Sequence, residues 1–165
     1  MIEGERGASI EAGPASFMLM DGTPVTGMID VSLTFIDPSN PEHLASAPGA
    51  FIGQTEDDST VAIESFGMID VVLSQNGARV QVRDGATVQI SIPAAEEATE
   101  LPSETPLWYF DEELGLWIEE GSATWDADAQ MYVGNVTHFT AWNIDVPYET
   151  ACITGVVIDD ATMSP

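Results

Sequence analysis

Apolar and polar residues alternate along most of this chain. In residues 28–35, apolar side chains occupy every odd position from Ile29 to Phe35, and polar side chains occupy the even positions between them. Such alternation predicts a strand with one buried face. The same motif recurs 40 residues later, because Gly27 to Leu33 matches Gly67 to Leu73 at all but one position. One recurrence is too little for a solenoid and predicts two similar strands in one domain.

Turn residues divide the middle of the chain into further strands. Asn76-Gly77 separates two apolar runs, 71–73 and 80–82, and predicts a tight hairpin because both residues tolerate positive φ. Asp84-Gly85 then leads into a third alternating run at 87–92. We expect these three strands to form a meander.

The second half of the chain repeats this organisation. Two hairpins are expected, one between 107–110 and 116–120 and one between 124–125 and 131–133, followed by a last strand at 136–144. The acidic, proline-flanked stretch 93–105 predicts a surface connection with at most a single helical turn at 94–99. The pattern predicts an all-β antiparallel sandwich of about ten strands with Greek-key-like connections.

Charge narrows the set of partners. The chain of 165 residues carries 28 acidic residues against three arginines and no lysine, which gives a formal charge of −25. Such a surface repels nucleic acid and anionic lipid, so neither is an expected partner. No apolar run approaches the ~20 residues of a membrane span. The N-terminus lacks a signal-peptide pattern, so an export signal would lie outside this segment.

The acidity itself has two explanations. It serves either as a solvated surface suited to a saline medium or as a source of calcium ligands. Asp126 and Asp128 are the candidate calcium ligands, although they lack a complete calcium-loop signature. No other cofactor is expected. Cys152 is the only cysteine, so no disulfide forms within the chain, and we expect it to be a buried strand residue.

One tripeptide, His138-Phe139-Thr140, carries a specific candidate chemistry. The Thr140 hydroxyl would attack the carbonyl carbon of Phe139, which converts the peptide bond to an ester that water then hydrolyses. His138 would move the proton, since an imidazole titrates near neutral pH. Backbone strain at this point would be required. The alternative is an ordinary strand in which the tripeptide has no chemical role.

Other enzymatic functions lack a motif. The carboxylates are scattered through turns, and neither a nucleophile elbow nor a phosphate-binding or dinucleotide-binding glycine pattern occurs. The chain is therefore not expected to act on an external substrate. The four tryptophans either pack in the core or form a platform for sugars, and core packing is the commoner role in hairpins. They are Trp108, Trp117, Trp125 and Trp142.

Several segments resemble a known family. The segments are 8–17, 21–27, 33–38, 64–68, 106–121 and 132–143. They are similar to the ZU domain of zonula occludens proteins, netrin receptors and the death-domain scaffold PIDD, and more closely to its relatives in bacterial surface proteins. Some family members cleave themselves at His-Phe-Ser, so the resemblance implies that role for His138, Phe139 and Thr140, with threonine in place of serine.

The resemblance also implies a domain organisation. Residues 1–147 would form the ZU-like domain, with 1–7 flexible, and 148–165 would form a linker and the first strand of a truncated carboxypeptidase-regulatory-like domain of transthyretin type. The function implied is a non-catalytic structural or adhesive module of a large bacterial surface protein, located at the cell surface or outside the cell. The alternatives are a self-cleaving module and a calcium-binding or carbohydrate-binding module. The expected partners are neighbouring domains and an unidentified protein or glycan.

Overall fold

The structure is a computed structural model, and it describes residues 1–148. Strands dominate it, together with one short α-helix, α1 (Pro41–Leu44), and one 3-10 turn, η1 (Glu5–Gly7). The strands are β1 (Ile2–Glu3), β2 (Ser9–Ala12), β3 (Phe17–Leu19), β4 (Asp30–Ile36), β5 (Ile52–Gln54), β6 (Thr60–Gln75), β7 (Ala78–Val82), β8 (Val88–Pro93), β9 (Glu104–Asp111), β10 (Leu116–Asp126), β11 (Met131–Val136) and β12 (Ala141–Pro147).

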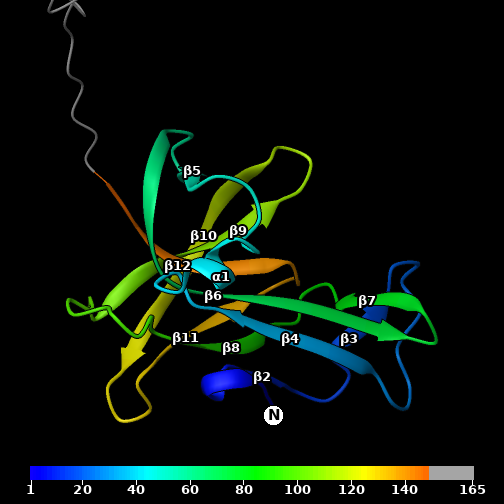
Figure 1. Ribbon diagram of the computed structural model, residues 1–165. Helices are drawn as coiled ribbons and strands as arrows, with labels where there is room; N and C mark the ends of the chain where they lie inside the picture. Colours follow the sequence, from blue (N-terminus) through cyan, green and yellow to red (C-terminus); the bar gives the residue numbers. More distant parts are fainter. Residues whose placement is uncertain (149–165) are drawn as a thin grey trace, which may run out of the picture.

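The predicted all-β antiparallel fold is confirmed apart from one parallel pair, β5 with β10, and it has twelve strands rather than about ten. Along the sheet the order is β1-β2-β8-β11-β10-β9-β12-β6-β7-β3, while β4 pairs with β6, and β5 pairs with β6 and β10. The sheet folds over on itself, so that side chains from β2 and β8 meet those of β6 and β7 in one main core. Figure 1 shows the long strand β6 running from the neighbourhood of β5 to β7.

The two copies of the repeated motif lie beside each other. Strands β4 and β6 pair antiparallel, with Val31 opposite Leu73 and Leu33 opposite Val71. The expectation of two similar strands in one domain is therefore correct. The hairpin at Asn76-Gly77 also forms as predicted, and both of its residues have positive φ, at 52° and 82°.

Two details of the predicted strand arrangement are wrong. Strand β8 does not continue a meander, because it pairs with β2 and β11 rather than with β7. The turn at 84–85 instead carries the chain to the other half of the sheet. The last strand begins at Ala141 and not at residue 136, since residues 137–140 form a bend between β11 and β12. Within 94–99 the chain forms a single hydrogen-bonded turn, in which Ala98 N–H donates to Ala95 O at 3.1 Å, and the α-helix at 41–44 was not predicted.

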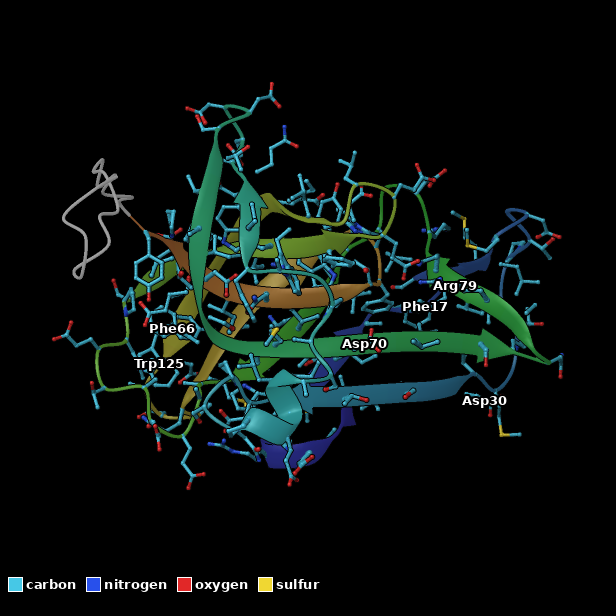
Figure 2. The ribbon with its side chains drawn as sticks, turned by 45° about the horizontal axis from the view of Figure 1, so that its top comes forward. Phe17, Asp30, Phe66, Asp70, Arg79 and Trp125 are labelled. Atoms are coloured by element: carbon cyan, nitrogen blue, oxygen red, sulfur yellow. The ribbon has the colours of Figure 1, made fainter. Side chains whose placement is uncertain are left out.

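A second, smaller core lies on the opposite face of the central strands. It contains Ile36, Ile63, Met68, Trp108, Trp117 and Ala141. The connection between β4 and β5, which includes α1, covers it through Ala47 and Phe51. Neighbouring residues on the central strands therefore serve different cores: Leu107 faces the main core and Trp108 the smaller one. Figure 2 shows α1 lying beside β4 and β6.

The N-terminal residues are tied to the body of the domain. Residues 1–7, which we expected to be flexible, contribute β1 and η1. The Arg6 guanidinium lies 2.6 Å from Asp37 Oδ2 and packs over the Phe35 ring, 5.3 Å from its centroid. Asp37 Oδ2 also accepts the N–H of Glu96 at 3.4 Å, so one carboxylate joins three segments. Cys152 and the linker and strand predicted within 148–165 lie outside the described residues, except for Tyr148.

Candidate functional site

The bend between β11 and β12 contains the predicted self-cleavage residues. The side-chain amide of Gln81, on β7, holds Phe139 at both backbone groups: its Nε2 donates to Phe139 O and its Oε1 accepts from Phe139 N, each at 2.8 Å. The Trp142 indole donates to His138 O at 3.1 Å. Phe139 itself is buried in the main core. These contacts fix the bend as part of the domain's packing.

The Thr140 hydroxyl is engaged away from the predicted scissile bond. It donates to the carbonyl oxygen of Phe110 at 3.0 Å. Thr140 also lines a small depression of about 280 Å³, together with the carboxylates Asp70 and Glu112. Burial raises the pKa of Asp70, and the charge of Glu112 adds to this effect against the opposing charge of Arg79. Sequence reasoning did not place these carboxylates near Thr140.

His138 faces aromatic side chains rather than Thr140. Its ring lies 4.6 Å from that of Tyr109 and 5.1 Å from that of Trp142, measured between centroids. Its Nδ1 lies 3.9 Å from Glu120 Oε1. Burial lowers the pKa of His138, and Glu120 partly opposes this. The side-chain hydrogen bonds of the described residues include none between His138 and Thr140.

Asp126 and Asp128 lie in the turn of the β10–β11 hairpin. Asp126 Oδ1 accepts the backbone N–H groups of Asp128 and Ala129 at 2.9 and 3.0 Å, so this carboxylate closes the turn. Within residues 1–148, no group of three or more His, Cys, Asp or Glu side chains is arranged to hold a metal ion. Calcium binding at these two residues stays a prediction.

Three of the four tryptophans are buried. Trp108, Trp117 and Trp142 have no exposed surface. Trp125 is partly exposed and packs on Tyr132, with ring centroids 5.0 Å apart. Tyr132 in turn stacks with Phe66 at 6.5 Å. Figure 2 shows Phe66 and Trp125 close together at one end of the domain, so a single tryptophan remains for the predicted sugar platform.

A groove of about 1010 Å³ opens at this same end of the domain. Four segments line it: the region after β4, strand β6, the connection between β8 and β9, and the end of β12. Its apolar lining consists of Pro38, Leu44, Phe51, Ile63, Phe66, Ala95, Ala98, Leu101, Pro102, Val146 and Tyr148. Its polar lining consists of Ser39, Glu64, Ser65, Glu97, Thr99 and Glu100.

Hydrogen bonds to backbone oxygens hold both walls of the groove. On one side the N–H of Ala95 donates to Phe66 O at 2.5 Å, and the Tyr132 hydroxyl donates to Pro102 O at 2.8 Å. On the other side the N–H of Ile63 donates to Phe51 O at 3.2 Å. The groove is therefore part of the folded structure, as expected of a surface that binds without large rearrangement.

A buried polar network borders the groove through Ser65. The Ser65 hydroxyl donates to Asn143 Oδ1 at 2.6 Å, and Asn143 Nδ2 donates to Asp145 Oδ2 at 2.7 Å. The other carboxyl oxygen of Asp145 has no hydrogen-bond partner among the described residues. Burial raises the pKa of Asp145 well above the ordinary aspartate value. This network lies where the pairing of β12 with β6 shifts register, between Ile144 and Asp145.

The groove was absent from the sequence-based predictions. Its lining comes from residues as far apart as Pro38 and Tyr148, and only the fold brings them together. The one local signal is the acidic, proline-flanked stretch 93–105, which predicts a surface connection. The stretch does connect two strands at the surface, and it also forms one wall of the groove.

Comparisons with known proteins identify relatives among mammalian cartilage intermediate layer proteins. The chain is 29% identical over 158 residues to cartilage intermediate layer protein 2 of Homo sapiens, and 28% identical over 165 residues to human cartilage intermediate layer protein 1. These alignments cover 86% and 90% of this chain but only 13% of each relative. Cartilage intermediate layer protein 1 of Sus scrofa is 25% identical over 155 residues, or 87% of this chain and 25% of that protein.

No family model matches the chain, and no solved structure matches it. The resemblance to ZU and carboxypeptidase-regulatory-like domains therefore stays a prediction. The relatives overturn the prediction of a bacterial surface-protein module, because they are animal cartilage proteins. They support the coarser expectation of an extracellular location. Among residues 1–148 no helix is long and apolar enough to cross a membrane.

Proposed function

We propose that this chain is a non-enzymatic, protein-binding module of a longer extracellular protein of the matrix type. The observation that carries the proposal is the groove of about 1010 Å³, which has a largely apolar lining and hydrogen-bonded walls. Its volume lies at the upper end of the range for ligand pockets, and its open shape suits an extended segment of polypeptide.

Two further observations support this function. The relatives are cartilage proteins of which the chain spans 13–25%, so a module within a larger assembly fits the alignment. The exposed side chain of Leu44, at the end of α1, contributes to the groove without belonging to either core. An apolar side chain in that position is available for a partner.

Selection from a random linear peptide library on the immobilised full chain tests the proposal. Enriched peptides are then synthesised, and their affinity for the wild-type chain and for Leu44→Asn is measured by fluorescence anisotropy. We expect Leu44→Asn to weaken binding about tenfold, because burying a leucine side chain contributes ~1.5 kcal/mol or more.

Leu114→Asn is the matched control. Leu114 is 61% exposed, lies in the turn between β9 and β10, and does not line the groove. Its substitution should leave the affinity unchanged. The proposal fails if selection yields no binding peptide, or if the two variants weaken binding equally.

A further inference from the structure

Resting on the proposed function, we propose that the groove takes a basic polypeptide segment in which lysine or arginine residues flank a short apolar stretch. Two features of the groove carry this inference. The apolar lining, with Phe51, Phe66 and Leu101, matches the apolar stretch. The exposed carboxylates Glu64, Glu97 and Glu100 match the flanking cations.

The charge of the groove is of one sign only. The described residues that line it include three glutamates and no lysine, arginine or histidine. Arg6, which contacts residues adjacent in sequence to the lining, is already paired with Asp37 and directs its other nitrogen to Ala94 O at 3.4 Å. Among the residues that line the groove, no cationic side chain pairs with Glu64, Glu97 or Glu100, the three rim glutamates. A partner that supplies cations therefore binds more tightly and associates faster.

The same charges argue against three other occupants. Residues 149–165 of this chain contain Glu149, Asp159 and Asp160 and no basic residue. A second copy of the chain would bring a further net charge of −25 to the contact. A sulfated polysaccharide would meet a surface of its own sign. Repulsion between like charges disfavours the binding of all three occupants to the groove.

The arrangement of the rim also constrains the sequence of the partner. Glu97 and Glu100 lie on the connection between β8 and β9, whereas Glu64 lies on β6. Because the glutamates come from two different segments, the proposal places cations on both sides of the apolar stretch rather than on one side. Ser65, which lines the groove, offers its hydroxyl oxygen as an acceptor for a backbone N–H of the bound segment.

Four synthetic peptides test this chemistry on the full chain. The first has leucine and phenylalanine flanked by lysines. The second replaces the lysines by glutamates, the third keeps the lysines and replaces the apolar residues by serines, and the fourth has the sequence of residues 149–165. We expect only the first to bind with measurable affinity in anisotropy titrations, and its affinity should fall as sodium chloride is added.

A triple variant tests the rim directly. Glu64→Gln, Glu97→Gln and Glu100→Gln together should weaken binding of the first peptide roughly threefold to a hundredfold, the range for three exposed ion pairs. The matched control is Glu3→Gln, Glu11→Gln and Glu113→Gln, which makes the same change in net charge at exposed positions outside the groove. This control should leave the affinity nearly unchanged.

The outcomes separate the chemistry from the proposed function. If library peptides bind with dependence on Leu44 but are neutral or acidic, the groove is a binding site and the basic partner is wrong. Binding of the 149–165 peptide, or a dimer that Leu44→Asn dissociates, likewise overturns the basic partner. If both triple variants lose affinity for the first peptide equally, net charge alone attracts the peptide, and the assignment of a basic partner to the groove is wrong. If no peptide depends on Leu44, the proposed function itself fails.

Discussion

At the scale of single residues, Asp145 is the most deeply buried carboxyl group among the described residues. It is fully buried, and only one of its oxygens has a hydrogen-bond partner among the described residues. A charged carboxylate in that position is costly, so burial raises the pKa of Asp145 well above the ordinary value. The protonated form is therefore the one that fits the fold.

Asp145→Asn should stabilise the domain at neutral pH. Because the folded pKa is raised, the contribution of Asp145 to stability is fully present below pH about 4 and is lost as pH rises through the folded value. Asparagine does not ionise, and its carbonyl oxygen can still accept the hydrogen bond from Asn143. Urea unfolding across a pH series should show a higher free energy of unfolding for the variant at pH 7, with the difference shrinking towards pH 4.

Asp128→Asn is the control for this comparison, because it removes an exposed carboxylate in a turn. It should not change the pH dependence. A parallel pH dependence for the wild-type chain and Asp145→Asn would contradict the assignment of a raised pKa.

The bend at His138-Phe139-Thr140 leads to a second prediction at this scale. We expect the chain to give one intact mass under denaturing conditions. The reason is that the Thr140 hydroxyl is bound to Phe110 O, and the Phe139 backbone is held on both sides by Gln81. Thr140→Ala should give the same single mass. Two fragments of 139 and 26 residues in the wild-type chain only would contradict this expectation.

At the scale of elements, the close approach of β6 to the end of β8 depends on a residue without a side chain. A Cβ at Gly67 would lie 2.4 Å from the backbone oxygen of Pro93, which cannot move without shifting β8. The next residue of β6 on the N-terminal side, Phe66, accepts the hydrogen bond that holds one wall of the groove. A change at Gly67 is therefore expected to affect both the packing of the two halves of the sheet and the shape of the groove.

Gly67→Ala should lower the free energy of unfolding by about 1–3 kcal/mol, the usual cost of overpacking a core. Gly13→Ala is the matched control, since a Cβ there meets only Ser16 Oγ at 3.7 Å. It should change stability by no more than about 0.5 kcal/mol. Denaturant unfolding of both variants measures the difference, and equal stabilities would show that β6 and β8 can separate at little cost.

Local patterns predicted the elements better than their arrangement. Alternation identified the strand at residues 28–35, and Asn76-Gly77 identified a hairpin, because side-chain period and turn geometry are properties of a few adjacent residues. The crossing of β8 to the other half of the sheet left no local signal, since Asp84-Gly85 would turn the chain equally well in either direction. The groove likewise required residues more than 100 positions apart, so no pattern within one segment could indicate it.

At the scale of the whole molecule, charge opposes the fold. The chain has a formal net charge of −25. Of its three arginines, only Arg6 makes an ion pair among the described residues. Repulsion between like charges favours the expanded, unfolded chain. Salt shortens the range of this repulsion from ~10 Å at 0.1 M to ~3 Å at 1 M.

Sodium chloride should therefore raise the Tm of the chain progressively between 0.1 and 1 M. Calcium chloride at matched ionic strength tests the predicted site at Asp126 and Asp128, because a cation bound only by the folded chain raises the Tm further. Differential scanning calorimetry measures both effects. A Tm that falls with sodium chloride contradicts the repulsion argument, and an additional rise with calcium would support the predicted site at Asp126 and Asp128.

The position of the first and last described strands has a mechanical consequence. Strand β1 has two residues and pairs only with β2 at the edge of the sheet, whereas β12 has seven residues and lies between β6 and β9. When the chain is pulled from both ends, β1 peels away one hydrogen-bonded pair at a time, while β12 must slide past two neighbours at once. Under tension the domain is therefore expected to yield first at its N-terminal edge, while β12 stays paired with both of its neighbouring strands.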